Sequence, residues 1–343
     1  MEILNGKEKI LVIQTAFPGD AILTLPMIQK LKEKYPNSSV DVVSIPATKE
    51  IFEYSPYVDK VIPLDKKGNQ KSVLQLISFV NNLKKNNYTK LYSPHRSFRT
   101  SLMVYLLNVK ESFGFDNASL SFVYNHVIRY DKTAHEVSRN LKLIGIEPDD
   151  EKWKIIPEIN SSKEIDEKIF DLTNNISLPI VAIAPGSVWH TKKYPEEYFE
   201  MAALHLIERN YFVVFIGGKE DYELCERLHQ NLKSGSQNFT GLLNIIESIQ
   251  LLRQCKLLIC NDSAPTHMGM AARIPVLTIY CSTIPDFGFY PYNEKSFLLS
   301  LDGLKCKPCG IHGRRKCPIK TFDCGFKLLP NVLIEKINLL LPL

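Results

Sequence analysis

The sequence predicts a doubly wound α/β protein with two domains. Short apolar runs typical of buried strands alternate with segments whose apolar residues recur at helical spacing. The chain has 343 residues, 45% of them hydrophobic, which is more than one ordinary core accommodates. A polar, proline-containing stretch at 146–164 interrupts the alternation and predicts the linker. We therefore expect two parallel sheets, each covered by helices on both faces.

The order of the elements follows from the positions of the apolar residues. Residues 9–14 form a run typical of a buried strand, and 21–35 carries apolar side chains at helical spacing. The rest of the first domain, 1–155, predicts strands at 40–44 and 90–92 and helices at 73–83 and 98–107. The second domain, 156–343, predicts strands at 180–184, 211–216, 256–260 and 275–280 and helices at 195–209, 221–232 and 245–254.

Charge and hydropathy narrow the class of protein. The 42 basic and 37 acidic residues give a net charge of +5, which is weaker than dedicated nucleic-acid binders carry, so we expect no nucleic-acid partner. An acidic substrate or an anionic membrane surface is compatible with this charge. The N-terminus lacks the apolar core of an export signal, and no stretch approaches a membrane span. We expect a cytoplasmic protein.

The most informative segment is 256–267, where a buried strand breaks on polar residues and a helix begins. Ligands of doubly wound sheets bind at such strand ends, and the amides of the first helical turn favour anions. Ser263, Ala264, Thr266 and His267 supply those amides. Asp262 has two interpretations, a helix cap or a ligand-binding carboxylate. A phosphate-bearing ligand is the first hypothesis.

Other predicted strand ends carry candidate catalytic and binding residues. Asp20 precedes the first helix and either caps it or acts as a general base towards a substrate hydroxyl. Lys192 and Lys193 follow a strand and are either solvated or neutralise a diphosphate. Glu220, after the next strand, offers a carboxylate to ribose hydroxyls.

These motifs together resemble glycosyltransferase family 9, the lipopolysaccharide heptosyltransferases. The resemblance rests on Phe17 to Pro26, Lys192 to Pro195 and Asn261 to His267, supported by 92–99, 135–141 and the region from Cys306 to Cys324. It implies a GT-B architecture, in which two Rossmann-like domains face a central cleft. The first would bind the acceptor and the second, with its Cys-containing tail segment, the nucleotide sugar. The tail is more like that of the heptosyltransferase II enzymes.

The resemblance also implies an activity and roles for the site residues. Heptose would pass with inversion from ADP-heptose to the lipopolysaccharide inner core, Kdo-lipid A with or without a first heptose, at the cytoplasmic face of the inner membrane. Asp20 matches the catalytic base and Lys192 the lysine that contacts the donor phosphates. Asp262, Ser263, Ala264 and His267 match the donor loop, while Lys193 and Glu220 are further donor-binding candidates. Many family members have glycine at the position of Ala264, which puts donor identity in question.

Basic residues of the first domain are the candidates for binding an anionic acceptor. They are His95, Arg96, Arg99, His135 and Arg139. The other interpretation of each is a solvated surface residue. Charge-assisted hydrogen bonds to carboxylates or phosphates favour the first interpretation for the group as a whole.

Four of the eight cysteines, Cys306, Cys309, Cys317 and Cys324, follow a C-x2-C-x7-C-x6-C pattern. This spacing is compatible with structural zinc, but a reduced loop of a cytoplasmic protein explains it as well, and we favour no required cofactor. Two other functions stay open. One is a GT-B transferase that uses another nucleotide sugar, and the other is a non-catalytic nucleotide-binding module.

Overall fold

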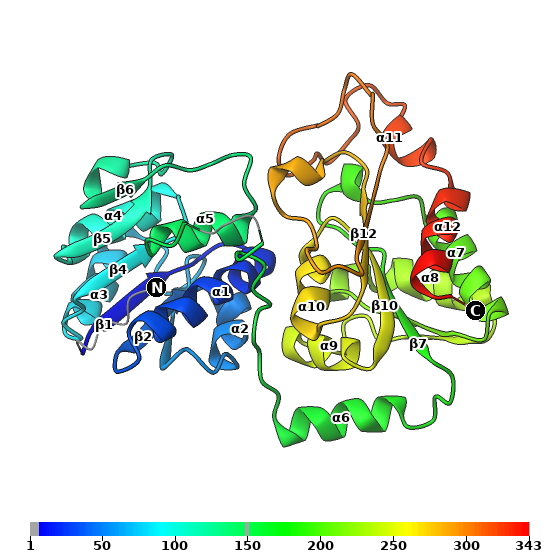
Figure 1. Cartoon of the computed structure of the whole chain (residues 1–343), viewed down its shortest axis with the longest axis horizontal. Coiled ribbons are helices and arrows are strands. Elements are labelled where there is room, and N and C mark those ends of the chain that lie inside the picture. The colour runs from blue at the N-terminus through cyan, green and yellow to red at the C-terminus, as the bar shows by residue number, and fades with distance from the viewer. Residues whose placement is uncertain (1–6, 148–150, 343) are drawn as a thin grey trace. The chain divides into compact units, whose positions relative to one another are not determined.

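The computed structural model describes residues 7–147 and 151–342. The chain divides into two compact units, residues 1–160 (unit 1) and 161–343 (unit 2). Each contains a six-stranded parallel sheet, so the predicted fold class is confirmed (Figure 1). The strand orders are β3-β2-β1-β4-β5-β6 and β12-β11-β10-β7-β8-β9. Counted from the first strand of each unit these are the same order, which reverses direction between β1 and β4 and between β7 and β10.

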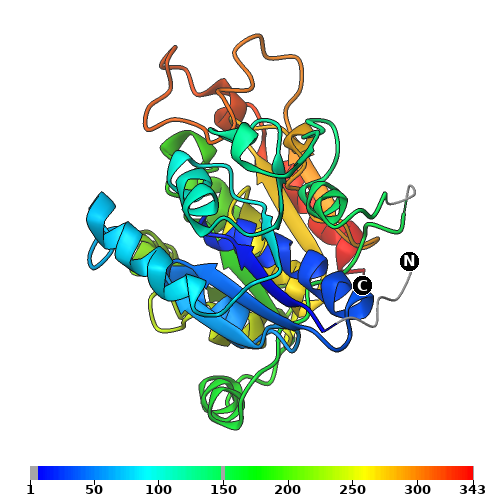
Figure 2. The same cartoon turned by 90° about the vertical axis from the view of Figure 1, so that its left-hand side faces the viewer.

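The sheet of unit 1 has helices on both faces. Its core joins α3 and α4 to one face through Leu76, Val80 and Met103, while α1 packs on α2 and α5 on the other. Figure 2 shows α1 (dark blue) and α3 (light blue) on opposite sides of the strands. The strands are β1 (Lys9–Ile13), β2 (Ser39–Ser44), β3 (Lys60–Pro63), β4 (Lys90–Ser93), β5 (Glu111–Phe115) and β6 (His126–Ile128). The helices are α1 (Pro18–Lys34), α2 (Lys49–Glu53), α3 (Val73–Lys84), α4 (Phe98–Leu107) and α5 (Glu136–Leu143).

Unit 2 repeats the arrangement around a second core. Side chains such as Phe199 on α7, Leu228 on α8 and Ile337 on α12 cover one face, and α9 packs on α10 and α6 on the other. The strands are β7 (Ile180–Ala184), β8 (Phe212–Phe215), β9 (Ser236–Asn238), β10 (Cys255–Asn261), β11 (Val276–Tyr280) and β12 (Phe297–Ser300). The helices are α6 (Lys163–Thr173), α7 (Glu196–Glu208), α8 (Tyr222–Leu232), α9 (Ile245–Leu252), α10 (Ala264–Ala272), α11 (Asp323–Phe326) and α12 (Pro330–Leu340).

The predicted linker at 146–164 includes residues 148–150, which lie outside the described residues. The segment just after them is held by unit 1. Gln29 donates to the carbonyl of Ile156 at 3.3 Å, and the backbone N–H of Asn160 donates to the carbonyl of Tyr54 at 2.7 Å. The division therefore falls after residue 160, whereas the sequence placed it after residue 155.

Candidate active site

Asp20 lies in the first turn of α1, just beyond the carboxyl end of β1. This is the switch point of unit 1, the place between β1 and β4 where the strand order reverses direction. Helix α1 begins at Pro18, three residues earlier than predicted, with Phe17 as its N-cap. Asp20 is therefore the third residue of the helix, and the interpretation as an N-cap is wrong. A chain of hydrogen bonds fixes this turn. Gln14 donates to the Thr24 hydroxyl at 2.9 Å, which donates to the carbonyl of Asp20 at 2.8 Å.

The electrostatic environment of Asp20 is unusual for a carboxyl group. Burial, together with the negative charge of Glu136, raises its pKa from 3.8 to about 7. A hydrogen bond from the backbone of Phe17 and the positive charge of Arg96 act in the opposite direction. A carboxylate with a pKa near the working pH is suited to accept a proton in a reaction.

Glu136 belongs to a buried network on α5. Its carboxylate forms an ion pair with Arg139 at 2.8 Å and accepts from the Tyr130 hydroxyl at 3.0 Å. Arg139 is only 2% exposed and also donates to Tyr130 and to the carbonyls of Asp131 and Lys132. The ring of Tyr130 lies 4.1 Å from the Arg96 guanidinium carbon. This network holds the two charges that shift the pKa of Asp20.

The other predicted acceptor residues are also held by the protein itself. His95 contacts the hydroxyls of Thr15 and Thr100 at 2.9 and 2.8 Å, and burial lowers its pKa to about 4, so it is neutral. Arg99 donates to two backbone carbonyls before α3. His135 is the N-cap of α5, where its Nδ1 accepts from the amide of Val137 at 3.2 Å. Within residues 7–147 and 151–342, Arg96 is the only one of the five whose side chain makes no such anchoring hydrogen bond.

In unit 2 the switch point brings together Lys192 and Asp262. Lys192 ends the short 3-10 helix η3 (His190–Lys192) after β7, and Asp262 directly follows β10. Their side chains form a nearly buried ion pair of 2.7 Å, and Thr283 donates to the same carboxylate oxygen at 2.7 Å. The N-cap of α10 is Ser263, so the interpretation of Asp262 as the cap is wrong.

Two buried side chains support this pair. Asn261 donates to the carbonyl of Pro185 and accepts from the amide of Tyr194, which ties the strand ends together. Thr191, beside Lys192, bonds to Ser282 at 2.9 Å and to the backbone of Arg314. Gly313 has a φ of +76°, and a Cβ atom there would lie 2.9 Å from Cγ of Lys192, so glycine suits this close approach.

The start of α10 is open to a ligand. Ser263 and Ala264 are half-exposed, and Ala264 and Pro265 are the first two helical residues. His267 is 5% exposed, and burial lowers its pKa to about 4. Its Nδ1 is buried and, within the described residues, has no hydrogen-bond partner. A neutral imidazole with an unsatisfied nitrogen is suited to hydrogen-bond a bound group.

Glu220 follows β8, and Lys193, which follows β7 and η3, lies near the same strand end. Glu220 is exposed, whereas the neighbouring Asp221 is half-buried against Gly186, where a Cβ atom would collide with its carboxylate. Burial raises the pKa of Asp221, and the charge of Lys193 opposes this shift. Asp221 is thus a second carboxylate at this strand end.

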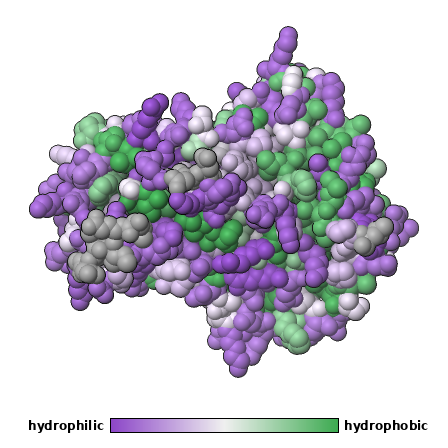
Figure 3. All heavy atoms as spheres, in the orientation of Figure 1, coloured by the Kyte–Doolittle hydropathy of each residue, from purple (hydrophilic) through white to green (hydrophobic). Residues whose placement is uncertain are grey.

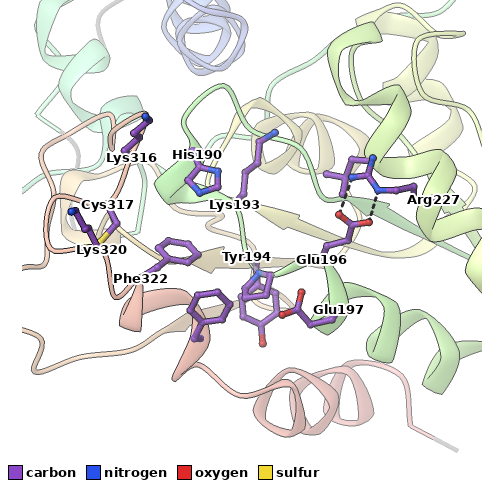
Figure 4. A pocket seen from close by; sticks show the side chains of 13 residues that line it. His190, Lys193, Tyr194, Glu196, Glu197, Arg227, Lys316, Cys317, Lys320 and Phe322 are labelled. Atoms are coloured by element: carbon purple, nitrogen blue, oxygen red, sulfur yellow. Dashed lines mark hydrogen bonds and ion pairs between the residues drawn. The ribbon is translucent and has the colours of Figure 1, made fainter.

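Lys193 also borders a cavity of about 670 Å³ within unit 2 (Figure 4). Lys316 and Lys320 of the Cys-containing loop and the rings of Tyr194 and Phe322 line it as well. On its far side Arg227 is neutralised by a bidentate ion pair with Glu196 at 3.0 and 2.9 Å. The two adjacent lysines therefore have different surroundings, since Lys192 contacts Asp262 and Lys193 borders this cationic cavity.

The Cys-containing loop shows no metal centre. Cys306, Cys309 and Cys317 are partly exposed free thiols, and Cys324 is buried in the core of unit 2. Among residues 7–147 and 151–342, no group of three or more metal-ligating side chains is arranged to hold an ion. Over the same residues, no helix has the length and apolarity needed to cross a membrane.

Several contributors to the site were missed from the sequence. The spacing of Glu136 and Arg139, three apart on a helix, is a local signal that predicts their ion pair. Tyr130, Thr283 and Asp221 carry no such signal, because their contacts depend on how distant segments pack.

Comparison with known proteins assigns the chain to a family. The family model described as glycosyltransferase family 9 (heptosyltransferase) matches residues 76–319. The chain belongs to glycosyltransferase family 9. It is 23% identical to lipopolysaccharide heptosyltransferase 2 of Escherichia coli, over 97% of this chain and 98% of that relative. This glycosyltransferase is therefore an enzyme of the family that the sequence motifs indicated.

Solved structures show the same fold for this family 9 glycosyltransferase. E. coli ADP-heptose lps heptosyltransferase II has a TM-score of 0.80 at 21% identity, covering 97% of this chain and 98% of that one. E. coli heptosyltransferase WaaC with ADP-2-deoxy-2-fluoro heptose has a TM-score of 0.72 at 18% identity, covering 96% and 99%. The likeness shows the predicted GT-B fold.

Proposed function

We propose that this glycosyltransferase moves a heptosyl group from ADP-heptose to a hydroxyl of the lipopolysaccharide inner core, with inversion at the anomeric carbon. The single observation that carries the proposal is the carboxyl group of Asp20, whose pKa lies near 7 at the switch point of unit 1. The names of its relatives support the donor and the acceptor class. We propose that unit 1 binds the acceptor and unit 2 the donor.

Asp20 would act as the general base. The acceptor oxygen attacks the anomeric carbon, the bond from that carbon to the β-phosphate oxygen breaks, and the hydroxyl proton passes to Asp20. Because burial and Glu136 both raise its pKa, the carboxylate is a stronger base than an ordinary aspartate while still partly ionised at neutral pH.

Lys192 and the start of α10 would stabilise the departing ADP. The ammonium group of Lys192 already neutralises Asp262, so a diphosphate bound there shares this positive charge with the amides of Ser263 and Ala264. The unsatisfied Nδ1 of His267 would hydrogen-bond the donor. Glu220 or Asp221 would hold the ribose hydroxyls, with Lys193 as a secondary contact to the phosphates.

Arg96 would contact the anionic acceptor, Kdo-lipid A with or without a first heptose. The anchored residues His95, Arg99, His135 and Arg139 would instead position the loops around it. This acceptor places the enzyme at the cytoplasmic face of the inner membrane.

The test is transfer by purified wild type and Asp20→Asn, with ADP-heptose and core acceptors carrying no heptose or one. We expect a heptose-sized mass gain with wild type and a fall in kcat of about 10²- to 10⁴-fold in the variant. Asp171→Asn, an exposed aspartate on α6, is the matched control and should keep full activity. No gain on either acceptor would overturn the proposed substrates, and a panel of other nucleotide sugars would follow.

A further inference from the structure

No side chain of the Cys-containing loop takes part in the proposed transfer, although this loop is strongly basic. Its residues 303–322 contain six lysines and arginines and no aspartate or glutamate, whereas the net charge of the whole chain is only +5. One of the six is held by the protein itself, since the ammonium group of Lys307 donates to the carbonyl of Tyr280 at 2.8 Å and to the hydroxyl of Ser300 at 2.7 Å. The other five are exposed. Figure 3 shows hydrophilic side chains (purple) projecting from the segment before α11. The loop therefore creates a local positive potential.

Two exposed lysines of this loop, Lys316 and Lys320, line the cavity of about 670 Å³ that Lys193 also borders (Figure 4). Lys193 directly follows η3, and backbone hydrogen bonds join η3 to the loop. The amide of Thr191 donates to the carbonyl of Arg314 at 3.1 Å, and the amide of Arg314 donates to the Thr191 hydroxyl at 2.8 Å. Over residues 7–147 and 151–342, none of the three lysines forms an ion pair. Three ammonium groups without a carboxylate partner therefore line one cavity.

The negative charges of the cavity do not balance these lysines. Two carboxylates line it, Glu196 and Glu197. Arg227 neutralises Glu196 through hydrogen bonds of 3.0 and 2.9 Å. Figure 4 shows Glu197 beside Tyr194, away from the lysines of the loop. With three ammonium groups against one remaining carboxylate, the cavity has a net positive charge and favours an anionic ligand.

Aromatic rings form another part of the lining. Phe322 and Phe326 pack edge to face with their ring centroids 5.5 Å apart, and Phe326 is 48% exposed. The ring of Tyr194 is fixed, because its hydroxyl donates to the carbonyl of Leu328 at 2.6 Å. A cavity of this volume that combines aromatic walls with a few charged groups is typical of sites for small organic ligands. The lining therefore suits a ligand with a ring as well as a negative charge.

The cavity is separate from the proposed donor site, although the two sites have adjacent lysines. Lys192 pairs with Asp262 at 2.7 Å. In the part of the chain that the structure describes, neither of these residues lines the cavity, and His267 does not line it either. A ligand in the cavity would therefore contact groups that the ion pair of the donor site leaves unused.

We propose that this cavity is a second anion site, which binds a small organic phosphomonoester. The phosphoryl group contacts the ammonium groups of Lys193, Lys316 and Lys320, and the ring lies against Phe322 and Phe326. Charge-assisted hydrogen bonds from ammonium groups to phosphate oxygens are strong, so the lysines select the phosphoryl group. Inorganic phosphate offers the same charge without the ring. Binding in the cavity does not depend on the donor or acceptor of the proposed function, so the two can fail separately.

The experiment is calorimetric titration of the whole protein with phenyl phosphate, inorganic phosphate and phenol. We expect phenyl phosphate to bind, inorganic phosphate to bind more weakly and phenol not to bind. Lys316→Gln with Lys320→Gln should lower the affinity for both phosphates about tenfold or more. Phe326→Ala should lower the affinity for phenyl phosphate about threefold and leave that for inorganic phosphate unchanged.

The matched control is Lys305→Gln with Arg315→Gln. These residues are exposed on the same loop and do not line the cavity, so the pair removes the same charge and should leave both affinities unchanged. Lys192→Ala separates the two sites, because it should weaken ADP binding and keep phenyl phosphate binding.

Three results would overturn the proposal. Equal losses in the cavity pair and the control pair would reduce the binding to general electrostatics. Loss of phenyl phosphate binding in Lys192→Ala would assign that binding to the donor site. Absence of phenyl phosphate binding to wild type, or binding no tighter than that of inorganic phosphate, would contradict an organic phosphomonoester as the ligand.

Discussion

The two units have the same strand order and place an aspartate at the same switch point, but the two carboxylates have different surroundings. Asp262 of unit 2 is neutralised by Lys192 at 2.7 Å and accepts a hydrogen bond from Thr283. Asp20 of unit 1 has Glu136 among its neighbours, and burial raises its pKa to about 7. The comparison teaches that topology fixes where a ligand binds, while the neighbouring charges decide whether a carboxylate anchors a cation or accepts a proton.

The largest expected effect is a loss of ADP affinity in unit 2, where the adjacent Lys192 and Lys193 can be compared. Lys192→Ala removes the cation that pairs with Asp262 and should weaken ADP binding by about 10- to 100-fold, the range of one charge-assisted hydrogen bond. Lys193→Ala is the matched control, because Lys193 borders the neighbouring cavity instead, and should change affinity much less. Calorimetric titration with ADP measures both. Equal losses would contradict the assignment of Lys192.

Arg139 tests whether the network behind Asp20 is structural. Arg139→Ala leaves Glu136 buried without its cation and should lower the free energy of unfolding by about 3 kcal/mol or more. The matched control is Arg129→Ala, because Arg129 is exposed and should be nearly neutral. Denaturant unfolding measures the difference. An Arg139 variant with unchanged stability and a raised acceptor KM would restore its interpretation as an acceptor-binding residue.

The smallest expected effect is a change in the melting temperature of the protein when Asp20 is replaced. Because its pKa is higher in the folded state than in the unfolded chain, the folded state binds the proton more tightly, and stability falls as pH rises from about 4 to 7. Asp20→Asn removes this penalty, so the melting temperature should exceed that of wild type by about 2 °C or more at pH 8 and by less at pH 5. Thermal melts across this range check it. A variant that melts lower at pH 8 would show that the charge is not destabilising.

Much of the fold was predictable from the sequence because buried strands of parallel sheets form continuous apolar runs. The strand at 180–184 was predicted with its observed bounds, and the helix at 98–107 likewise. The missed strands are short or polar, and β9 (Ser236–Asn238) consists of Ser, Gln and Asn. Its place in the sheet depends on pairing with β8, which no local pattern reveals.

The candidate site was predictable in position but not in electrostatics. Strand ends identified Asp20, Lys192 and Asp262 because the carboxyl edge of a parallel sheet is a general feature of the fold. The raised pKa of Asp20 depends first on its burial and then on Glu136, which the packing of α5 against α1 brings near it. Sequence reasoning likewise could not distinguish the buried Arg139 from an exposed arginine, since burial is a property of the tertiary structure.

The most direct test of the central claim is the pH dependence of kcat/KM for transfer by wild type, Glu136→Gln and Arg96→Gln. Ionisation of the base should make the rate of wild type rise with pH and level off near pH 7. Glu136→Gln removes a charge that raises the pKa of Asp20 and should move the bend to lower pH, whereas Arg96→Gln should move it to higher pH. Identical bends in all three proteins, or none between pH 6 and 8, would contradict Asp20 as the base.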